Sequence, residues 1–272
     1  MHAIDKAKRF VGSKLNRLVS LVSPIRRLIT KALNASGGLF CPVCESNIRR
    51  FGSFGDPPRA NARCPVCGSL ERHRLDWVFF TQKTDLFDKT NRVILHVAPE
   101  EYLSALFRRI KGLNYLSADM NNPKAMVKMD ITEIDFPNNT FNIIYCSHVL
   151  EHIQNDRKAI AELYRVLHHG GWAVLQVPIS VEKTYEDPAI IDPEGRKKHF
   201  GQWDHVRCCG PDYVERIRAA GFDVQVFRST DLVTEADCVR MAFQPSRFIF
   251  YCRKPWPNCA LQRPHLHGAA KF

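Results

Sequence analysis

The strongest constraint on this chain is a tetrapeptide, Cys-Pro-Val-Cys, that occurs twice, at residues 41–44 and 64–67. A Cys-x-x-Cys turn directs two thiolates at one ion, and two such turns close a tetrahedral shell of four sulfur atoms. Gly68 after the second pair tolerates the positive φ that this turn favours, whereas Glu45 follows the first pair and suits it less well. The pattern predicts a structural Zn²⁺ ribbon in preference to redox dithiols. Its ligands are Cys41, Cys44, Cys64 and Cys67.

The other cysteines show no ligand spacing, and we expect them to be reduced thiols. Ten cysteines in a chain with no secretion signal argue against a disulfide framework. After the second pair, Ser69 is expected to cap a helix whose apolar face includes Leu70, Trp77 and Val78. A closed four-thiolate shell leaves no position open for water, so we interpret the ribbon as structural.

Positive charge is concentrated at the beginning of the chain. The net charge is +11 over 272 residues, yet residues 1–34 hold eight Lys and Arg against one Asp. Apolar residues recur there at spacings of three and four, which predicts a basic amphipathic helical segment over residues 1–36. The favoured interpretation is a peripheral anchor on an anionic membrane surface. The alternatives are a helix docked on this protein or a second copy, an organelle transit peptide, or an RNA-binding arm.

From residue 91 the chain alternates β-branched runs with helical patterns, which is typical of a parallel sheet wrapped by helices. We predict an α/β fold: a Rossmann-like, doubly wound, seven-stranded sheet, preceded by the zinc ribbon and the amphipathic helices. No window approaches the roughly 18 apolar residues of a membrane-spanning helix. The expected domains are residues 1–36, a ribbon and helix over 37–82, the catalytic domain over 83–252, and a tail over 253–272.

Two predicted strands of this domain end in a carboxylate. Asp119 ends the second strand, at a spacing after Val97 that suits hydrogen bonds from ribose hydroxyls, and Asp130 ends the third. Ligands of such sheets bind beyond the carboxyl ends of the strands, where the winding direction reverses. Acids at two successive strand ends therefore predict a nucleoside-binding site.

Over about residues 90–252 the sequence resembles the class I S-adenosylmethionine-dependent methyltransferases, type 11-like, with an N-terminal zinc ribbon. The resemblance rests on Ser-Ala-Asp at 117–119, Met-Asp-Ile at 129–131, and Ser-His-Val-Leu-Glu-His at 147–152 followed by residues 163–177. It implies S-adenosylmethionine as cofactor. It also implies Asp119 on the ribose, Asp130 and the Ile131 amide on the adenine, and Ser147 and His148 near the methionine moiety. The residue-based alternatives are a helix cap for Ser147 and a packed, hydrogen-bonded ring for His148.

The first loop departs from the family's glycine-rich pattern. Ala98, Pro99 and Glu100 stand where Gly-x-Gly-x-Gly is common, and His96 stands where an acid is frequent. Either the loop holds the cofactor differently, with Glu100 near its amino group, or binding is lost. The intact acids and the 147–152 segment favour retained binding, and the Ala-Pro-Glu loop resembles a zinc-ribbon-bearing bacterial branch of the family.

Residues 181–210 form an irregular stretch, which inside a compact domain is usually functional. Methyl transfer to an activated sulfonium mainly requires alignment, while a hydroxyl nucleophile also benefits from a base. His199, Asp204 and His205 are the catalytic candidates, and the alternative is a structural Asp204–His205 pair. We do not expect His199 and His205 to bind a metal, because no third ligand is spaced with them.

The leading hypothesis is a methyltransferase acting on a small-molecule, lipid-linked or saccharide acceptor, in the cytoplasm and peripheral to the inner face of the membrane. An RNA methyltransferase is the second hypothesis, weakened because residues 91–272 carry 23 basic and 21 acidic residues. The third is a non-catalytic zinc-ribbon adaptor with a degenerate cofactor loop. Acceptor atom and oligomeric state are not predictable from this pattern.

Overall fold

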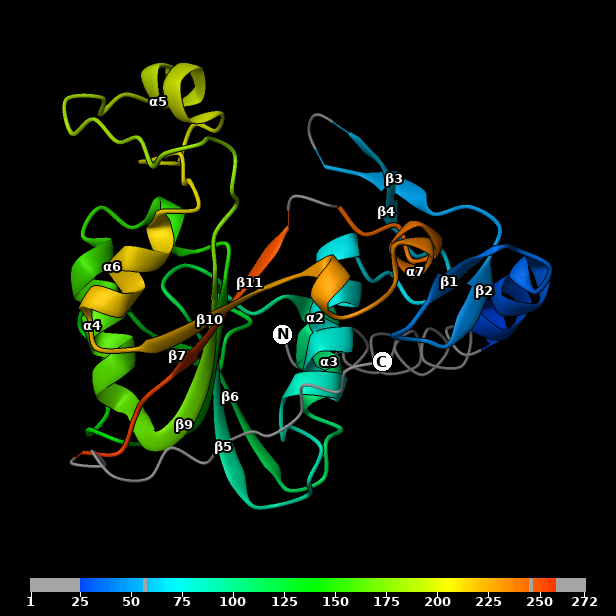
Figure 1. The fold of residues 1–272 in the computed structure, drawn as a ribbon, viewed down its shortest axis with the longest axis horizontal. Coiled ribbons are helices and arrows are strands. Elements are labelled where there is room, and N and C mark those ends of the chain that lie inside the picture. Colours follow the sequence, from blue (N-terminus) through cyan, green and yellow to red (C-terminus); the bar gives the residue numbers. More distant parts are fainter. Residues whose placement is uncertain (1–24, 56–57, 245–246, 258–272) are drawn as a thin grey trace, which may run out of the picture. The chain divides into compact units, whose positions relative to one another are not determined.

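The structure is a computed structural model that describes residues 25–55, 58–244 and 247–257. The chain forms two compact units, Met1–Asp88 with Arg228–Arg247, and Lys89–Phe227 with Phe248–Phe272 (Figure 1). Residues 25–34 are helical, as expected, while the remainder of the predicted basic segment and most of the predicted tail lie outside the described residues. Among the helices that the structure describes, none has the length and apolar character to cross a membrane.

The described part of the first unit consists of two antiparallel hairpins, the helix over residues 25–34 and two further helices. The elements are β1 (Leu39–Cys41), β2 (Ser46–Ile48), β3 (Gly52–Phe54), β4 (Arg59–Arg63), α2 (Glu71–Lys83) and α7 (Glu235–Arg240), with a 3-10 turn over Ser229–Asp231. β1 pairs with β2, and β3 pairs with β4. The short strands bury a small apolar cluster around Ile48 and Phe51, together with the first cysteine of each motif, Cys41 and Cys64. A core this small needs an additional staple.

Helix α2 begins one residue later than a cap at Ser69 requires, so that expectation was wrong. Leu70 is the N-cap residue, its amide donates to His73 Nδ1 at 3.2 Å, and Ser69 Oγ instead lies beside the cysteine sulfurs. The segment 228–247 groups with this unit, although the sequence boundaries placed it in the catalytic domain. The reason is tertiary: Arg74 on α2 donates to the carbonyls of Met241 and Ala242, at 2.8 and 3.4 Å.

The second unit contains the predicted seven-stranded sheet. Its strands are β5 (Arg92–Val97), β6 (Leu113–Asp119), β7 (Val127–Lys128), β8 (Phe141–Ser147), β9 (Leu167–Gln176), β10 (Asp223–Arg228) and β11 (Phe248–Arg253). The order across the sheet is β10-β11-β9-β8-β5-β6-β7. The pairs of β5 with β6 and β8, of β6 with β7 and of β8 with β9 are parallel, and β11 is antiparallel to β9. All seven predicted strands are confirmed, with β7 much shorter than expected.

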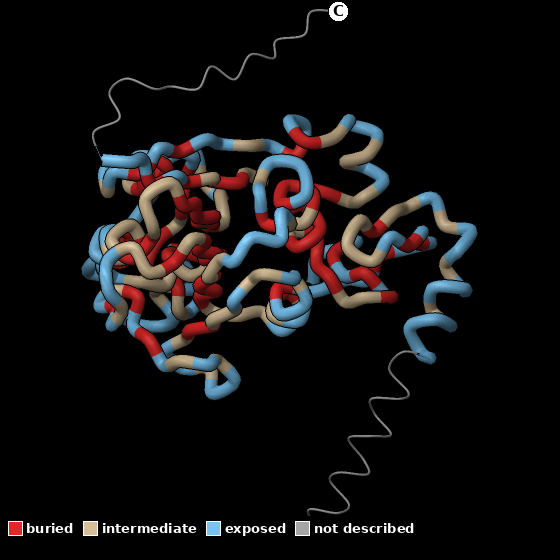
Figure 2. Tube along the Cα trace, turned by 90° about the horizontal axis from the view of Figure 1, so that it is seen from below, coloured by how far each residue is buried: buried red, intermediate tan, exposed pale blue. Residues whose placement is uncertain are grey.

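Helices cover both faces of this sheet. They are α3 (Glu101–Phe107), α4 (Asp156–Val166) and α6 (Tyr213–Ala219), whereas α5 (Pro193–Phe200) projects away from the sheet; a 3-10 turn spans Leu150–His152. Helices α4 and α6 pack against each other on one face, and α3 packs against β6 on the other (Figure 1). Buried residues from the strands and from α4 and α6 form the core, seen as the red interior in Figure 2. The doubly wound prediction is therefore confirmed.

Two local sequence signals do not predict the ends of α4: Asp156 is of a residue type that favours a helix N-cap, and the Gly-Gly pair at 170–171 is typical of a helix end. Asn155, not Asp156, caps its N-terminus, because the Asn155 side chain accepts from the Lys158 amide at 3.1 Å. The glycines at 170–171 do not end it, since β9 already begins at Leu167 and runs through them. Phe141 pairs with Leu167 across the sheet. This tertiary pairing overrides the local helix-stop signal.

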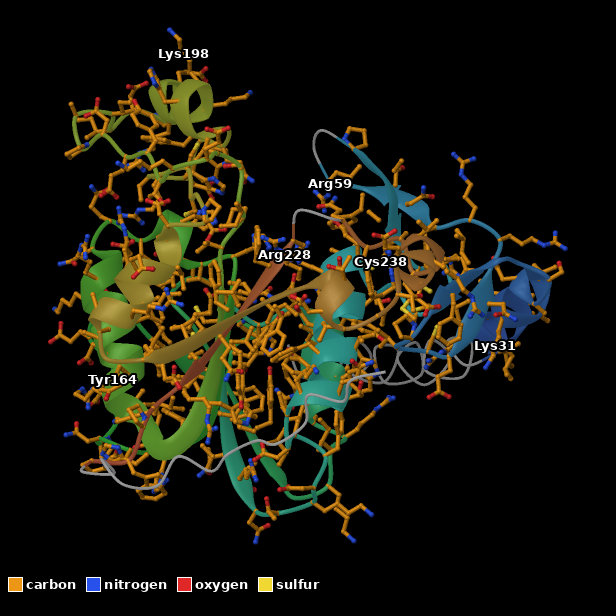
Figure 3. The ribbon with its side chains drawn as sticks, in the orientation of Figure 1. Lys31, Arg59, Tyr164, Lys198, Arg228 and Cys238 are labelled. Atoms are coloured by element: carbon orange, nitrogen blue, oxygen red, sulfur yellow. The ribbon has the colours of Figure 1, made fainter. Side chains whose placement is uncertain are left out.

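The irregular stretch over residues 181–210 contains a helix that the pattern did not predict. Helix α5 has Pro193 in its first turn, and Asp192 Oδ1 accepts from the Gly195 amide at 2.8 Å. Its face is mostly exposed, and Lys198 projects outward from it (Figure 3). The Asp-Pro pair that begins α5 is a helix-start signal that sequence reading could have used.

Candidate active site

The site is located by sheet topology. β5 is the first strand of the sheet, and its two neighbours, β6 and β8, lead away in opposite directions, so the winding reverses between β5 and β8. In open α/β sheets ligands bind beyond the carboxyl ends of the strands at this reversal. The residues that follow β5 and β8 are Ala98 and His148, and they stand next to one another in strand order.

Both residues have left-handed backbones, with φ of 48° at Ala98 and 58° at His148. The Ala98 amide donates to the Ala118 carbonyl and the His148 amide to the Gln176 carbonyl, each at 2.9 Å. These bonds fix a conformation that is unfavourable for residues with a Cβ. Ala98 therefore adopts the conformation for which a glycine is ordinarily chosen, although the sequence lacks that glycine. Left-handed non-glycine residues cluster at functional sites.

A series of side-chain hydrogen bonds holds the loop after β5 in place. Ser104 Oγ donates to the Glu100 carbonyl at 2.9 Å, and Tyr115 hydroxyl donates to Ser104 Oγ at 2.8 Å. His96 Nδ1 lies 3.0 Å from that hydroxyl, and because the tyrosine proton is already used, Nδ1 must be the donor. Burial raises the pKa of Tyr115. His96 is fully buried among aromatic rings, so it acts on the loop through Tyr115.

The strand-end acids hold their own loops. Asp119 Oδ1 accepts from the amides of Asn121 and Asn122, both at 2.7 Å, which leaves the second carboxylate oxygen to a ligand. Asp130 is exposed, and its Oδ1 accepts from the amide and hydroxyl of Thr132. Ile131 next to it is buried. The carboxylates are thus oriented by backbone bonds rather than neutralised by cations.

Two further cofactor candidates lie close to the reversal. Ser147, the last residue of β8, is buried, and its hydroxyl donates to Gln176 Oε1 at 3.1 Å. Pro99 and Glu100 follow Ala98 and are half-buried, and Glu100 is the N-cap residue of α3 without a side-chain capping bond. Candidates from β5 and β8 therefore lie at the same edge of the sheet.

A polar cluster lies directly beyond β8. Glu151 is 1% exposed, and its Oε1 lies 3.3 Å from His148 Nδ1 and 4.0 Å from His152 Nε2. His152 Nδ1 lies 3.2 Å from Asp204 Oδ2, and its ring packs edge-on against His205, with centroids 4.6 Å apart. Burial, reinforced by the neighbouring His152, lowers the pKa of His205. The structure thus joins two predicted catalytic residues to Glu151 and His152, which sequence reasoning did not select.

The third candidate, His199, is not part of this cluster. It is exposed on α5, where its Nδ1 lies 3.5 Å from the Tyr185 hydroxyl. The spacing of six residues to His205 does not bring the two imidazoles together, because α5 ends at Phe200 and the chain then turns.

An arginine that the sequence analysis missed fastens the cluster together. Arg207 is 2% exposed and donates to the carbonyls of Leu150 and Ile153, both at 2.7 Å, and of Gln154 at 3.1 Å. Its Nε donates to Glu186 at 3.0 Å. These bonds connect the loop that carries His205 to the turn that carries Glu151 and His152.

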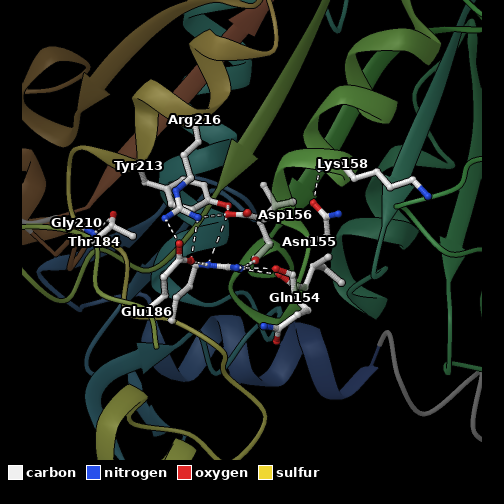
Figure 4. A network of polar contacts seen from close by, with 12 residues as sticks. Gln154, Asn155, Asp156, Lys158, Thr184, Glu186, Gly210, Tyr213 and Arg216 are labelled. Carbon is white, nitrogen blue, oxygen red and sulfur yellow. Dashed lines mark hydrogen bonds and ion pairs between the residues drawn. The ribbon is translucent and has the colours of Figure 1, made fainter. Parts of the chain in front are cut away.

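The network extends to α4 and α6. Asp156 Oδ2 accepts from the Tyr213 hydroxyl at 2.8 Å and from Arg216 at 2.9 Å, and Arg216 also pairs with Glu186 (Figure 4). The hydrogen bond from Arg216, with a smaller contribution from Arg207, lowers the pKa of Glu186 to about 2. The network therefore holds the stretch over residues 181–210 against α4 and α6.

In the first unit the four predicted zinc ligands come together as the spacing indicates. Sγ atoms of Cys41 and Cys67 lie 3.7 Å apart, and those of Cys44 and Cys64 lie 3.9 Å apart. Sulfurs placed tetrahedrally about 2.3 Å from Zn²⁺ are about 3.8 Å from each other. In both turns the residue after the second cysteine has a left-handed backbone: Gly68 has φ of 81° and Glu45 has φ of 50°. The donor set and spacing fit Zn²⁺.

Arg74 explains how this site is balanced. The side chain is fully buried, stacks 3.9 Å over the Phe51 ring, and donates to backbone carbonyls, including that of Ala62 at 2.9 Å. Burial lowers the pKa of Arg74, and the thiolates of Cys41 and Cys64 oppose that shift. A four-thiolate zinc centre carries a net charge of about −2. A buried cation beside it reduces the cost of that charge.

The chain was compared with known protein families and solved structures. Residues 91–175 match the family model described as a methyltransferase domain. No curated protein matches the chain. Solved structures with a similar fold include a putative methyltransferase from Bacillus halodurans, with 16% identity, TM-score 0.43, and coverage of 67% of this chain and 99% of that one. The [4+2]-cyclase SpnF has 16% identity, TM-score 0.49, and coverage of 86% and 96%.

A phosphoethanolamine N-methyltransferase from Haemonchus contortus shares 14% identity, with TM-score 0.45 and coverage of 68% of this chain and 53% of its own. The match over residues 91–175 defines the class: the second unit contains a methyltransferase domain, and the protein is an enzyme that transfers methyl groups. S-adenosylmethionine as the methyl donor is supported by this class.

Proposed function

We propose that this protein transfers a methyl group from S-adenosylmethionine to a hydroxyl of a small-molecule, lipid-linked or saccharide acceptor. The observation that carries the proposal is the meeting of two features at one sheet edge. The left-handed backbones of Ala98 and His148 mark the reversal point, and the cluster of Glu151, His152, Asp204 and His205 follows β8 directly. The first feature suits a nucleoside cofactor, and the second suits a hydroxyl that must lose a proton.

The cofactor supplies a methyl group already activated on a sulfonium, so the chain's own task is alignment. Asp119 is assigned to the ribose hydroxyls, because one of its oxygens is left after Oδ1 has bound the backbone. Asp130 and the Ile131 amide are assigned to the adenine, and Ser147 and His148 to the methionine part. His96, Pro99 and Glu100 shape the loop that faces that part.

The acceptor is assigned to the cluster beyond β8. Asp204 orients His152, and the buried position of His205 shields it from water. Either imidazole can take up the proton that the acceptor hydroxyl loses as the new C–O bond forms. His199 has no assigned part in this step, because it lies on the exposed side of α5.

Calorimetry with S-adenosylmethionine tests the cofactor assignment. Asp119→Asn keeps an acceptor for the Asn121 and Asn122 amides but loses the charge, so affinity should fall about 10- to 100-fold. Asp135→Asn, an exposed acid in the same unit, is the matched control and should bind normally. Equal affinity of the two variants, or no binding by the folded wild type, would contradict the proposal.

The acceptor class is tested by transfer of a labelled methyl group into a cell extract that is then separated into lipid, small-molecule and RNA fractions. We expect label in the lipid or small-molecule fraction. His205→Gln should reduce the incorporated label to background. Label in RNA that ribonuclease removes would favour the second hypothesis, an RNA methyltransferase.

Peripheral membrane binding is the second part of the proposal. Within the described part of the helix over residues 25–34, Leu28 is 67% and Leu33 is 65% exposed, while Arg26, Arg27 and Lys31 supply cations. Such a helix suits an anionic lipid surface. Full-length protein should pellet with phosphatidylglycerol vesicles and not with phosphatidylcholine vesicles, and Leu28→Asp with Leu33→Asp should abolish pelleting. Pelleting that survives both substitutions would refute the anchor.

The bound metal of the first unit is proposed to be Zn²⁺, held by the four cysteines and without a role in methyl transfer. The closed donor set leaves no coordination position for a substrate.

A further inference from the structure

We propose that Glu151, His152 and His205 bind a divalent transition-metal ion at the acceptor side of the active site. One ligand atom from each side chain lies within 4.8 Å of the other two. Glu151 and His152 belong to the turn after β8, whereas His205 comes from the loop that follows α5. The third ligand that the sequence spacing does not offer is therefore supplied by the fold.

The first argument is the state of Glu151. Its side chain is 1% exposed, and Oε2 is a buried atom for which the described residues provide no hydrogen-bond partner. Oε1 is shared between His148 and His152, at 3.3 and 4.0 Å. A buried carboxylate is costly unless it is paired or coordinates a metal. An ion bound at Oε2 supplies the missing partner.

The second argument is the orientation of the two imidazoles. His152 Nδ1 faces Asp204 Oδ2 at 3.2 Å, which leaves Nε2, the atom nearer to Glu151, with its lone pair. His205 bonds the Phe200 carbonyl through one ring nitrogen, and a neutral ring then has an acceptor at the other. Metal-binding histidines characteristically donate their second ring N–H to a carboxylate or a backbone carbonyl. Both imidazoles have this arrangement.

The donor set identifies the class of ion. Two imidazoles and one carboxylate suit Zn²⁺, Fe²⁺, Mn²⁺ or Co²⁺, while Mg²⁺ and Ca²⁺ prefer oxygen ligands. At ligand distances of about 2.1 Å, ligands opposite each other in an octahedron are about 4.2 Å apart. Because the three ligand atoms lie within 4.8 Å of one another, ion binding requires an inward movement of at most a fraction of an ångström at each side chain.

Three protein ligands leave positions open for an acceptor oxygen. With the ion bound, both imidazoles would serve as ligands and not as bases; the ion would lower the pKa of a bound acceptor hydroxyl and hold it in place, and its proton would pass to solvent water. This role rests on the proposed methyl transfer to a hydroxyl, but the presence of the ion does not. Metal binding and cofactor binding can accordingly be measured separately.

Cobalt(II) added to the zinc-loaded, full-length protein provides the test. Zinc then occupies the four-cysteine site. Replacement of this zinc by cobalt would produce an intense sulfur-to-cobalt charge-transfer band. We expect one equivalent of Co²⁺ to bind with weak visible bands and without that charge-transfer band. Glu151→Gln and His205→Ala should each lose this equivalent, and Asp204→Asn should weaken its binding about 10- to 100-fold. His199→Ala is the matched control for binding, because His199 is a nearby exposed imidazole outside the cluster.

The wild-type titration alone can overturn the proposal. No cobalt bands, or bands of the thiolate type only, would exclude the site whether or not the variants fold. Bands that persist unchanged in Glu151→Gln and His205→Ala would assign the ion to another place. Cobalt bound as expected by a protein that fails to bind S-adenosylmethionine would leave the metal site standing and remove the proposed function.

Discussion

Replacement of Arg207 tests whether one buried side chain joins the acceptor loop to the turn after β8. Arg207→Met retains an apolar stem of similar length and removes the guanidinium that binds three carbonyls and Glu186. Hydrogen bonds to charged groups contribute about 1.5–3 kcal/mol each, and loss of a partner in a buried ion pair costs about 3–5 kcal/mol.

We expect a loss of stability at the lower end of the range of about 3–5 kcal/mol. Asp156 lies 3.6 Å from Arg207 but keeps its bonds from Tyr213 and Arg216, and Glu186 keeps Arg216, so neither carboxylate is left alone. The three carbonyls carry the loss, because the turn has no other donor of this reach. We expect the second unit to lose about 3 kcal/mol, or about 6–12 °C in Tm for a domain of this size.

Thermal unfolding followed by circular dichroism measures this loss. Arg218→Met is the control, since Arg218 pairs with Glu215 at the surface and should change stability by less than about 0.5 kcal/mol. Arg207→Lys keeps the charge but not the planar fork, so it should restore only part of the loss. Below Tm, Arg207→Met should also weaken Co²⁺ binding at the cluster while leaving S-adenosylmethionine affinity unchanged. A Tm equal to that of Arg218→Met would refute the reasoning.

Three other changes have expected outcomes. Cys64→Ser, or a strong chelator, should release the zinc measured by elemental analysis and unfold the first unit, because zinc binding supplies folding energy in small modules. Ala98→Gly should leave S-adenosylmethionine affinity intact and raise the free energy of unfolding by up to about 1 kcal/mol, while Ala98→Val should lower both, since β-branched residues resist a positive φ. Glu186 has a pKa lowered from 4.5 to about 2 in the folded state, so it stabilises the protein above pH 4.5 and loses that contribution as the pH falls toward 2; Glu186→Gln should flatten acid unfolding across that window.

The sheet was predictable because its strands are buried runs between turn signals, and such runs need little tertiary context. The sequence pattern failed to predict local structure where contacts with distant parts of the chain determine it. The glycines at 170–171 read as a helix end, yet they lie inside β9, where Gly170 has φ of 78° and approaches the Trp256 ring closely. A side chain from the far end of the chain thus requires the glycine. Helix α5 was missed because its sequence is mostly polar, and the single buried Phe200 forms no apolar stripe.

The zinc ligands were predictable because both pairs are local in sequence and each turn fixes two sulfurs. The acceptor cluster was not, since Glu151 and His205 are brought together only by the chain's return from α5. Their ligand atoms come within reach because Val206 donates its amide to the Glu151 carbonyl at 3.0 Å and Arg207 binds the same turn. No local pattern encodes such a bridge, so spacing alone argued against a metal at His205.

The Ala-Pro-Glu loop shows how a changed motif can retain the conformation that the motif serves. A left-handed residue with a Cβ costs about 1–2 kcal/mol, and the loop meets that cost at Ala98. The conformation persists because the Ala98 amide bonds Ala118 on β6, while the chain from His96 through Tyr115 and Ser104 fixes the Glu100 carbonyl. Strain maintained by this many bonds indicates a functional constraint on the loop. The backbone therefore favours a working cofactor loop over a degenerate one, and a buried histidine supports it from within the sheet.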